Sequence, residues 1–239
     1  MNSEVKISII IPVYNSETFI CETIDKIKEQ NISSYEIIVV DDGSTDSSAK
    51  LLQKYEEIIY IFKENGGPAS ARNLGLKHAK GSYIIFIDID DFWEEGSLNK
   101  LSDYLDKHPS TQIIEGKIRE FRTYQNSNEF DFSTESYFTS NFGTCMIRRE
   151  VFAIVGDFEE KLLRSEDIDW YTRAWEKNIT KDRLDIIVLN YRKHSESLTS
   201  KYGEHGQFYR LLLFKLKIER EKSRNYIPHG NLIDYIGKR

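Results

Sequence analysis

Short runs of β-branched and aromatic residues alternate with helix-like segments through the first hundred residues of the chain. The apolar runs have the length of strands, and amphipathic stretches of helical periodicity separate them. Strands that alternate with helices are typical of stacked βαβ units around a parallel sheet. The pattern predicts strands at Lys6–Ile11, Glu36–Val40, Ile58–Phe62 and Tyr83–Ile87, and helices at Glu17–Gln30, Thr45–Tyr55 and Ser70–Lys80.

The strands themselves are nearly continuous in apolar residues, as in the runs IIVV and YIIFI. Such runs lack the alternation of a half-exposed strand, and this indicates burial on both faces of the sheet. Helices on each face provide that burial. The expected fold class is therefore α/β, with a Rossmann-like, doubly wound and mostly parallel central sheet.

The pattern changes after Asp91. A helix at Ser97–Lys107 ends before Pro109, and the polar stretch Tyr124–Ser136 predicts a loop or a flexible hairpin. Two domains are expected, one over residues 1–200, with halves at about 1–95 and 96–200, and a basic helical tail over 201–239. The remaining predicted elements are a strand at Thr144–Arg148, helices at Arg149–Val155 and Glu166–Lys177, a strand at Arg183–Leu189 and a helix at Gln207–Arg224.

Composition and charge exclude several functional classes. The 239 residues carry a net charge of -6, and an acidic protein is a poor general binder of nucleic acid, which requires clustered Lys and Arg. No apolar run approaches the ~20 residues of a membrane-spanning helix. The charge is uneven, because nine basic and four acidic residues lie between Lys201 and Arg239.

That basic tail leaves two interpretations open. The helix over residues 206–225 either packs its LLLF stripe on the core or contacts a membrane surface or a partner protein. Cys21 and Cys145 lack the spacing of a disulfide framework or a zinc site, and the N-terminus lacks the pattern of a signal peptide. A cytoplasmic location is expected, and under the second interpretation the protein would be peripheral at the inner face of the membrane.

Candidate chemistry lies at the ends of the four predicted strands. Ligands of open parallel sheets bind beyond the carboxyl ends of the strands, so polar residues there are the first candidates. These ends are Pro12-Val13-Tyr14-Asn15, Asp41-Asp42-Gly43-Ser44-Thr45-Asp46, Asn65-Gly66-Gly67-Pro68 and Asp88-Ile89-Asp90-Asp91. Four acidic, glycine-rich or aromatic loops are therefore expected at one edge.

Asp88 and Asp90 are the most informative pair. If the strand continues through them, both carboxylates point to one side while Ile89 points into the core. Two such oxygen donors suit Mg²⁺ or Mn²⁺, and a divalent ion would let an acidic protein hold a diphosphate. The alternative is an acidic turn that ends the strand.

The other strand ends admit both structural and functional interpretations. Ser44 is a candidate N-cap, whereas one of the two preceding carboxylates could accept a hydrogen bond from a nucleotide base or ribose. The glycines at 66 and 67 permit close approach of a ligand, and Arg72 follows as a phosphate or carboxylate binder. Taken alone, each of these motifs has low specificity.

The second half contributes two further candidates. Asp167 lies at a predicted helix start, where it either favours the helix dipole or acts as a general base toward an acceptor hydroxyl. His194 follows the last predicted strand, as a metal ligand or as a solvated loop residue. The sequence alone leaves these alternatives open.

Taken together, the motifs resemble those of one known family. SIIIPVYNSETFI, EIIVVDDGSTDSS, ENGGPASARNLGL, GSYIIFIDIDD, FGTCMIRREVF and SEDIDWYTRAW occur in order, and over about residues 5 to 195 the chain resembles the family-2 glycosyltransferases with a GT-A fold. The resemblance implies transfer of one sugar from a nucleotide diphosphate sugar, such as a UDP-sugar, with inversion. The acceptor would be a hydroxyl of a carbohydrate, a lipid-linked molecule or a protein.

The resemblance also assigns roles. Asp167 would be the general base, Asp90 the principal ligand of Mn²⁺ or Mg²⁺, and His194 a ligand found in only some members. Pro12 and Tyr14 would line the nucleotide pocket, Asp42 would contact the base and Asp88 would lie near the ribose. The full donor-binding set is Pro12, Tyr14, Glu17, Asp42, Gly67, Arg72, Asp88 and Ile89.

The chain departs from the usual family pattern at two points. Ile89 replaces a residue that is often small in the family, and a Gln-x-x-Arg-Trp motif is missing, which favours single additions over processive synthesis.

The alternatives to a transferase are a catalytically inactive nucleotide-sugar-binding module and a sugar nucleotidyltransferase. The acid set argues against the first, and the absence of a basic glycine-rich loop after the first strand argues against the second.

Overall fold

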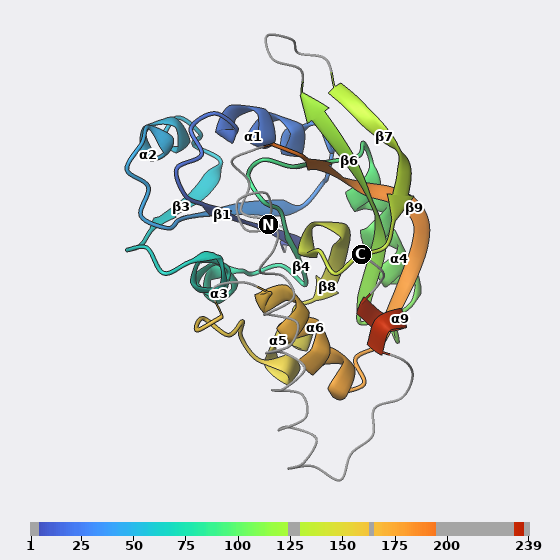
Figure 1. Cartoon of the computed structure of the whole chain (residues 1–239). Coiled ribbons are helices and arrows are strands. Elements are labelled where there is room, and N and C mark those ends of the chain that lie inside the picture. Colours follow the sequence, from blue (N-terminus) through green and yellow to red (C-terminus); the bar gives the residue numbers. More distant parts are fainter. Residues whose placement is uncertain (1–4, 124–129, 163–164, 195–231, 237–239) are drawn as a thin grey trace.

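One sheet runs through the part of the chain that the computed structural model describes, which is residues 5–123, 130–162, 165–194 and 232–236. Its strands follow the order β3-β2-β1-β4-β8-β6-β9-β5, and β7 pairs with β6 (Figure 1). β1 (Ile7–Val13), β2 (Tyr35–Asp41), β3 (Ile58–Phe62) and β4 (Tyr83–Phe86) are parallel neighbours. All four strands were predicted.

Helices cover both faces of this parallel half. Alternate residues of β1 face opposite ways, so Ile9 packs in the cluster that contains α1 (Ile20–Lys28), while Ile10 packs with α3 (Pro68–His78). Figure 1 shows α1 on one side of β1 and α3 on the other. A Cβ on Gly75 of α3 would lie 2.4 Å from Ile10, so glycine permits this close packing. The doubly wound arrangement is confirmed.

Two predicted helices are shorter than expected. α1 begins at Ile20 instead of Glu17, and α2 (Ser48–Leu52) begins at Ser48 instead of Thr45. Loop hydrogen bonds explain the difference: the Asp46 carboxylate accepts from the backbone N–H of Ser48, and the Ser44 hydroxyl accepts from the N–H of Asn15. The prediction that Ser44 caps the helix is wrong, because it holds the neighbouring loop instead.

The second half of the sheet is mixed. The polar stretch expected as a loop or hairpin is a hairpin in its described part, because β7 (Phe130–Tyr137) pairs antiparallel with β6 (Ile113–Thr123). The pattern did not predict β5 (Phe92–Trp93), which has only two residues. The other elements are α4 (Ser97–Lys107), the 3-10 helix η1 (Phe142–Thr144), β8 (Cys145–Arg148), α5 (Glu150–Val155), α6 (Glu166–Glu176), β9 (Lys181–Arg192) and α9 (Leu232–Ile236).

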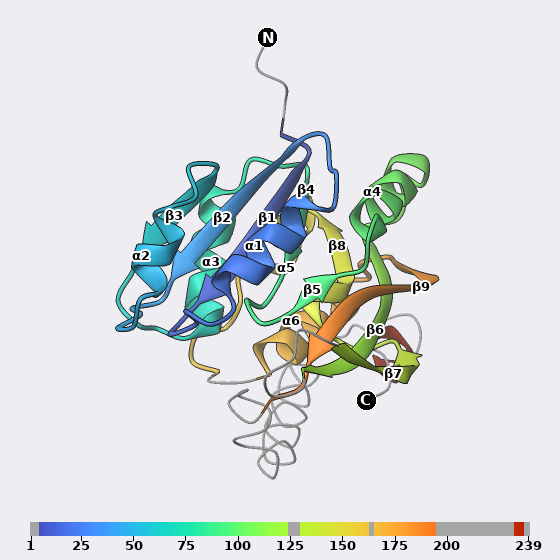
Figure 2. The same ribbon diagram turned by 90° about the horizontal axis from the view of Figure 1, so that it is seen from above.

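The length of β9 matters for the site. Strand periodicity predicted Arg183–Leu189, but the strand continues to Arg192 and pairs with β5 and β6. This extension carries the chain to His194 beside the β4 loop. Figure 2 shows β9 and β5 next to each other on the side of the sheet that lies away from β3.

The described residues include little of the predicted C-terminal tail. The predicted helix at 207–224 and most of the proposed tail domain lie outside the described residues. Among the helices that the structure describes, none has the length and apolar character required to cross a membrane. Cys21 and Cys145 are both free, and Cys145 lies buried with its Sγ 2.6 Å from the Tyr171 hydroxyl.

Candidate active site

The loops after β1 and β2 are joined by hydrogen bonds at the carboxyl edge of the sheet. The Asn15 side chain accepts from the backbone N–H of Thr45, and the Glu17 carboxylate accepts from the N–H of Ser47. Asn15 adopts a left-handed φ of 47°, a conformation that asparagine tolerates. Pro12 is half-buried and Tyr14 is 52% exposed beside this junction. The Tyr14 ring is therefore available to a ligand, while Glu17 already has a backbone partner.

Asp42 organises the glycine-rich turn after β3. Its carboxylate accepts from the backbone N–H groups of Gly66 and Gly67 at 2.9 and 2.7 Å, and from Lys63 Nζ at 2.6 Å. Gly67 has a φ of 86°, which favours glycine, and Pro68 then opens α3. Asp42 is only 3% exposed. The carboxylate thus fixes the loop, and its contact with a base stays a prediction.

This arrangement predicts a stability effect for Asp42→Asn. Asparagine offers one acceptor oxygen and turns an N–H₂ donor toward a backbone donor, and the half-buried partner Lys63 loses its countercharge. We expect the free energy of unfolding to fall by about 2 kcal/mol. Urea denaturation measures the change, with Asp103→Asn on the exposed face of α4 as the matched control. Equal midpoints for the two variants would contradict the structural role.

Arg72 connects the two halves of the site. It lies in α3, is 8% exposed, and donates from Nη1 to Glu166 and from Nη2 to Asp88 at 2.8 Å. Glu166 begins α6 and directly precedes Asp167. A guanidinium has several N–H donors in a fixed plane, so it can bind two carboxylates at once. Arg72 therefore links the acidic loop after β4 to the helix that carries the predicted base.

Charges around this link shift the pKa values of its members. Burial alone would lower the pKa of Arg72, but the Asp88 and Glu166 carboxylates raise it overall, so the guanidinium stays charged. Burial raises the pKa of Asp88, Arg72 opposes that shift, and the negative charge of Asp90 adds to it. The site therefore concentrates negative charge that a single Arg neutralises only in part.

Asp88 and Asp90 lie together, but not as the strand pattern predicted. β4 ends at Phe86, and the backbone N–H of Asp91 donates to the carbonyl of Asp88 at 3.1 Å, which makes the segment a turn. The expectation that the strand continues is wrong, although Ile89 does pack its side chain into the core. Any contact of Ile89 with a donor would be made by its backbone.

Asp90 faces His194. The Asp90 Oδ2 lies 2.8 Å from the His194 Nε2, and both side chains are partly exposed. Arg192 holds the chain just before His194, because its backbone N–H donates to the Asp91 carboxylate and its Nε donates to the Asp90 carbonyl. The structure thus brings together the two residues predicted as metal ligands, which are 104 positions apart in sequence.

Asp167 lies in the first turn of α6, after Ser165, which has a left-handed φ of 61°. Its Oδ1 accepts from the backbone N–H of Ile168, and its side chain is half-buried. The negative charge of Asp167 also raises the pKa of Arg72, so the predicted base lies within the same electrostatic cluster. Its role as a base stays a prediction.

The sequence did not predict two ion-pair partners in the site, Glu166 for Arg72 and Lys63 for Asp42. Glu166 gave only the signal of an acidic helix start, and Lys63 gave none beyond its position after β3. Both are revealed by contacts with residues that are far apart in the chain. A charged residue that pairs across loops leaves no periodic signal in one sequence.

The donor set at Asp90 and His194 is compatible with a divalent metal ion. A carboxylate oxygen and an imidazole nitrogen are both accepted by Mn²⁺, whereas Mg²⁺ prefers oxygen. Within the described ranges, no three His, Cys, Asp or Glu side chains form a ready metal site. The protein would therefore supply a minority of the ligands, and the diphosphate and water would supply the rest.

Comparison with known proteins agrees with this architecture. A family model described as glycosyl transferase family 2 matches residues 8–157. The uncharacterized glycosyltransferase EpsJ of Bacillus subtilis is 30% identical over 215 residues, which cover 81% of this chain and 62% of EpsJ. The poly(ribitol-phosphate) beta-N-acetylglucosaminyltransferase TarS of Staphylococcus aureus is 33% identical over 116 residues, or 46% of this chain and 20% of TarS.

Two solved structures have a similar fold. TarS 1–349 in complex with UDP-GlcNAc has a TM-score of 0.67 and 25% identity, covering 82% of this chain and 61% of that one. The mannosyltransferase PcManGT from Pyrobaculum calidifontis, in complex with GDP-Man and Mn²⁺, has a TM-score of 0.67 and 17% identity, covering 92% and 65%. The GT-A fold expected from the sequence is confirmed. The chain spans less than two thirds of each of these proteins.

Proposed function

Because the chain belongs to glycosyl transferase family 2, we propose that it transfers one sugar from a nucleotide diphosphate sugar to an acceptor hydroxyl, with inversion at the anomeric carbon. The observation that carries the proposal is the cluster of Asp88, Asp90, Arg72 and Asp167 at the carboxyl edge of the sheet. UDP is the proposed nucleotide, because TarS has been solved with UDP-GlcNAc.

In this proposal Asp167 takes the proton from the acceptor hydroxyl as its oxygen attacks the anomeric carbon. The carbon–oxygen bond to the diphosphate breaks as the new glycosidic bond forms, and one such displacement inverts the configuration. Asp88 and the exposed Tyr14 would hold the ribose and base, and Glu166, through Arg72, would keep the first turn of α6 in position. The chain thus supplies orientation and a proton acceptor.

A divalent metal ion fits the proposal through Asp90 and His194. When bound, it would offset the charge that develops on the leaving diphosphate. We propose Mn²⁺ as the better match, because the donor set contains an imidazole nitrogen. Holding the ion through only two side chains leaves room for oxygens of the donor.

The decisive experiment combines binding and turnover. Calorimetry with UDP, GDP and TDP, each with and without Mn²⁺, identifies the nucleotide, and mass spectrometry then follows sugar release or transfer from the matching donor. We expect metal-dependent binding of UDP and slow hydrolysis of a UDP-sugar without acceptor.

Other outcomes would select the alternatives. Nucleotide binding without turnover on any sugar donor or acceptor would identify a binding module. Release of pyrophosphate from a nucleoside triphosphate and a sugar phosphate would identify a nucleotidyltransferase. Failure to bind any nucleotide diphosphate would contradict the proposal.

Arg72→Lys tests the link between the two acidic segments. A lysine provides one compact charge, so it cannot serve Glu166 and Asp88 at once as the guanidinium does. We expect kcat to fall by about tenfold, equal to ~1.4 kcal/mol, with a smaller change in the KM for the donor. Steady-state kinetics measures both values.

The control for that substitution is Arg173→Lys in the same helix as Asp167. Arg173 pairs with Asp169 and with carbonyls of the segment before α6, away from Asp88. We expect this variant to lose stability and to keep its kcat. Equal kinetic losses in both variants would show that Arg72 has no special role in positioning.

A further inference from the structure

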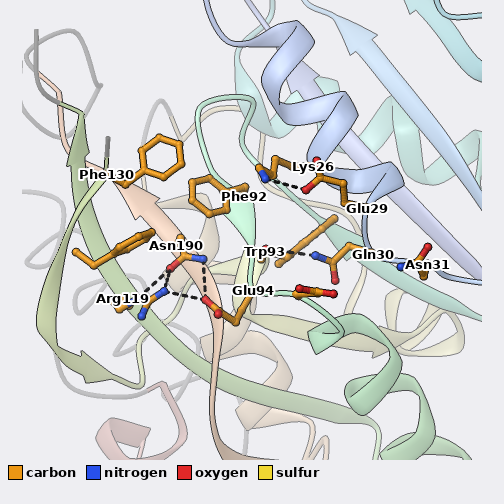
Figure 3. A pocket seen from close by; sticks show the side chains of 12 residues that line it. Lys26, Glu29, Gln30, Asn31, Phe92, Trp93, Glu94, Arg119, Phe130 and Asn190 are labelled. Carbon is orange, nitrogen blue, oxygen red and sulfur yellow. Dashed lines mark hydrogen bonds and ion pairs between the residues drawn. The ribbon is translucent and has the colours of Figure 1, made fainter. Parts of the chain in front are cut away.

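A cavity of about 640 Å³ lies between the end of α1 and strands β5, β6, β7 and β9. Figure 3 shows its lining, in which phenylalanine rings and polar side chains lie next to each other. Its size is in the range of small-molecule sites in proteins. The site described above does not use this cavity.

The aromatic side of the cavity is built by neighbouring strands. Phe92 of β5 lies 5.3 Å from Phe130 and 6.4 Å from Phe132, measured between ring centroids. The Arg119 guanidinium lies 4.1 Å from the centre of the Phe132 ring. Phe130 and Phe132 remain half-exposed on β7. These rings offer an apolar surface of fixed orientation.

The polar side is a fixed hydrogen-bonding group. Arg119 Nη2 donates to Glu94 Oε2 and to Asn190 Oδ1, each at 2.8 Å, and the Asn190 amide also donates to Glu94 Oε2 at 3.1 Å. Among the described residues, Glu94 Oε1 and Arg119 Nη1 have no hydrogen-bond partner. One acceptor and one donor are therefore held in place for a ligand.

Gln30 gives an independent indication of a ligand. It lines the cavity at the end of α1, is 3% exposed, and donates from Nε2 to the Trp93 carbonyl at 3.2 Å. Its buried Oε1 has no partner in the described part of the chain. Native proteins rarely leave such an acceptor unpaired. A ligand hydroxyl in the cavity would satisfy this oxygen once the Gln30 amide turns toward the cavity.

We propose that this cavity is a saccharide subsite that binds an uncharged sugar unit of the acceptor. This assignment rests on the proposed transferase function. A sugar ring presents an apolar face and several hydroxyls, and these match the aromatic rings and the fixed polar atoms. Three glutamates and two basic residues line the cavity, so its charge disfavours a phosphate-containing chain. The lining charges are Lys26, Arg119, Glu29, Glu94 and Glu95.

A continuous wall of rings connects this subsite to the catalytic edge. The His194 ring lies 5.2 Å from the Phe19 ring, and the Arg192 guanidinium contacts Phe19, Phe121 and Phe130 at 5.2, 4.7 and 5.9 Å. Phe121 and Phe130 in turn contact Phe92. Phe92, Phe121 and Arg192 are buried, so these contacts link the subsite to the residues proposed for catalysis through packed side chains.

The test measures saccharide binding directly. Ligand-observed NMR and calorimetry would use chitotetraose, cellotetraose and maltotetraose as neutral probes, and glycerol 3-phosphate and ribitol 5-phosphate as phosphate probes. We expect at least one neutral tetrasaccharide to bind. Phe132→Ala and Gln30→Leu should each weaken it by about fivefold, the effect of one lost aromatic or polar contact.

Controls separate the subsite from folding and from catalysis. Phe62→Ala removes an exposed phenylalanine on the distant strand β3 and should leave saccharide affinity within about twofold of the original. Thermal unfolding checks each variant, and UDP affinity should not change in either subsite variant. Gln30→Leu nearly keeps the side-chain volume, so this variant still tests the subsite if Phe132→Ala disturbs the β6–β7 hairpin.

The outcomes are distinct. Binding of no neutral probe, equal binding by the subsite variants, or binding of only the phosphate probes would overturn the proposal. If saccharide binds through Phe132 and Gln30 while no nucleotide diphosphate binds, the subsite stands as a saccharide site and the transferase function fails. If UDP binds and a UDP-sugar is turned over, but the Phe132 and Gln30 variants bind saccharide as well as the original protein, the transferase function stands and the subsite proposal fails.

Discussion

Asp167→Asn should reduce sugar transfer by about a thousandfold, within the range of lost general-base catalysis, and leave UDP binding nearly unchanged. Asparagine keeps the shape of the side chain and an oxygen that can accept from the N–H of Ile168, so the first turn of α6 should persist. Only the proton acceptor is lost. Turnover by mass spectrometry and UDP affinity by calorimetry measure the two effects separately.

The matched control for Asp167→Asn is Asp169→Asn, two positions along the same helix. Asp169 is buried and its carboxylate pairs with Arg173, so the change should lower stability while turnover stays within about threefold of the original. Unchanged turnover in Asp167→Asn would refute the assignment of the base. A matched loss of turnover in both variants would mean that the helix, and not the carboxylate, is responsible.

The sequence predicted those features that a local pattern records. Buried parallel strands leave apolar runs, and strand ends at one edge bring distant loops together, so the approach of Arg72 to Asp88 could be anticipated. The two-residue strand β5 left too little pattern to detect. The extension of β9 to Arg192 was missed because Asn190 and Arg192 interrupt the apolar run, and they bond to Arg119 of β6 and to Asp91.

Side-chain partners were much less predictable than positions. Asp42 was expected to face a ligand, yet its carboxylate holds the backbone of Gly66 and Gly67. Arg72 was expected near the donor, and it pairs with Asp88 and with a glutamate 94 positions away. Such pairings depend on tertiary distances, which one sequence without relatives does not encode in any periodic signal.

Asp90→Ala should abolish the metal-dependent part of nucleotide binding and weaken UDP affinity in the presence of Mn²⁺ by about a hundredfold. Asp90 supplies the carboxylate of the proposed pair, while His194 supplies an imidazole nitrogen. The fold should tolerate the change, since Arg192 Nε bonds to the backbone carbonyl of Asp90 and not to its carboxylate. Asp88 and Arg72 keep their own contact.

His194→Ala should have a smaller effect than Asp90→Ala, because the carboxylate alone still attracts the cation. Calorimetry with UDP, with and without Mn²⁺, gives both values, and the exposed Asp103→Asn serves as the control for removal of a negative charge. Equal UDP affinity with and without Mn²⁺ in the original protein would remove the metal from the mechanism. The positive charge opposite the diphosphate would then have to come from Arg72, whose two carboxylate partners already compete for it.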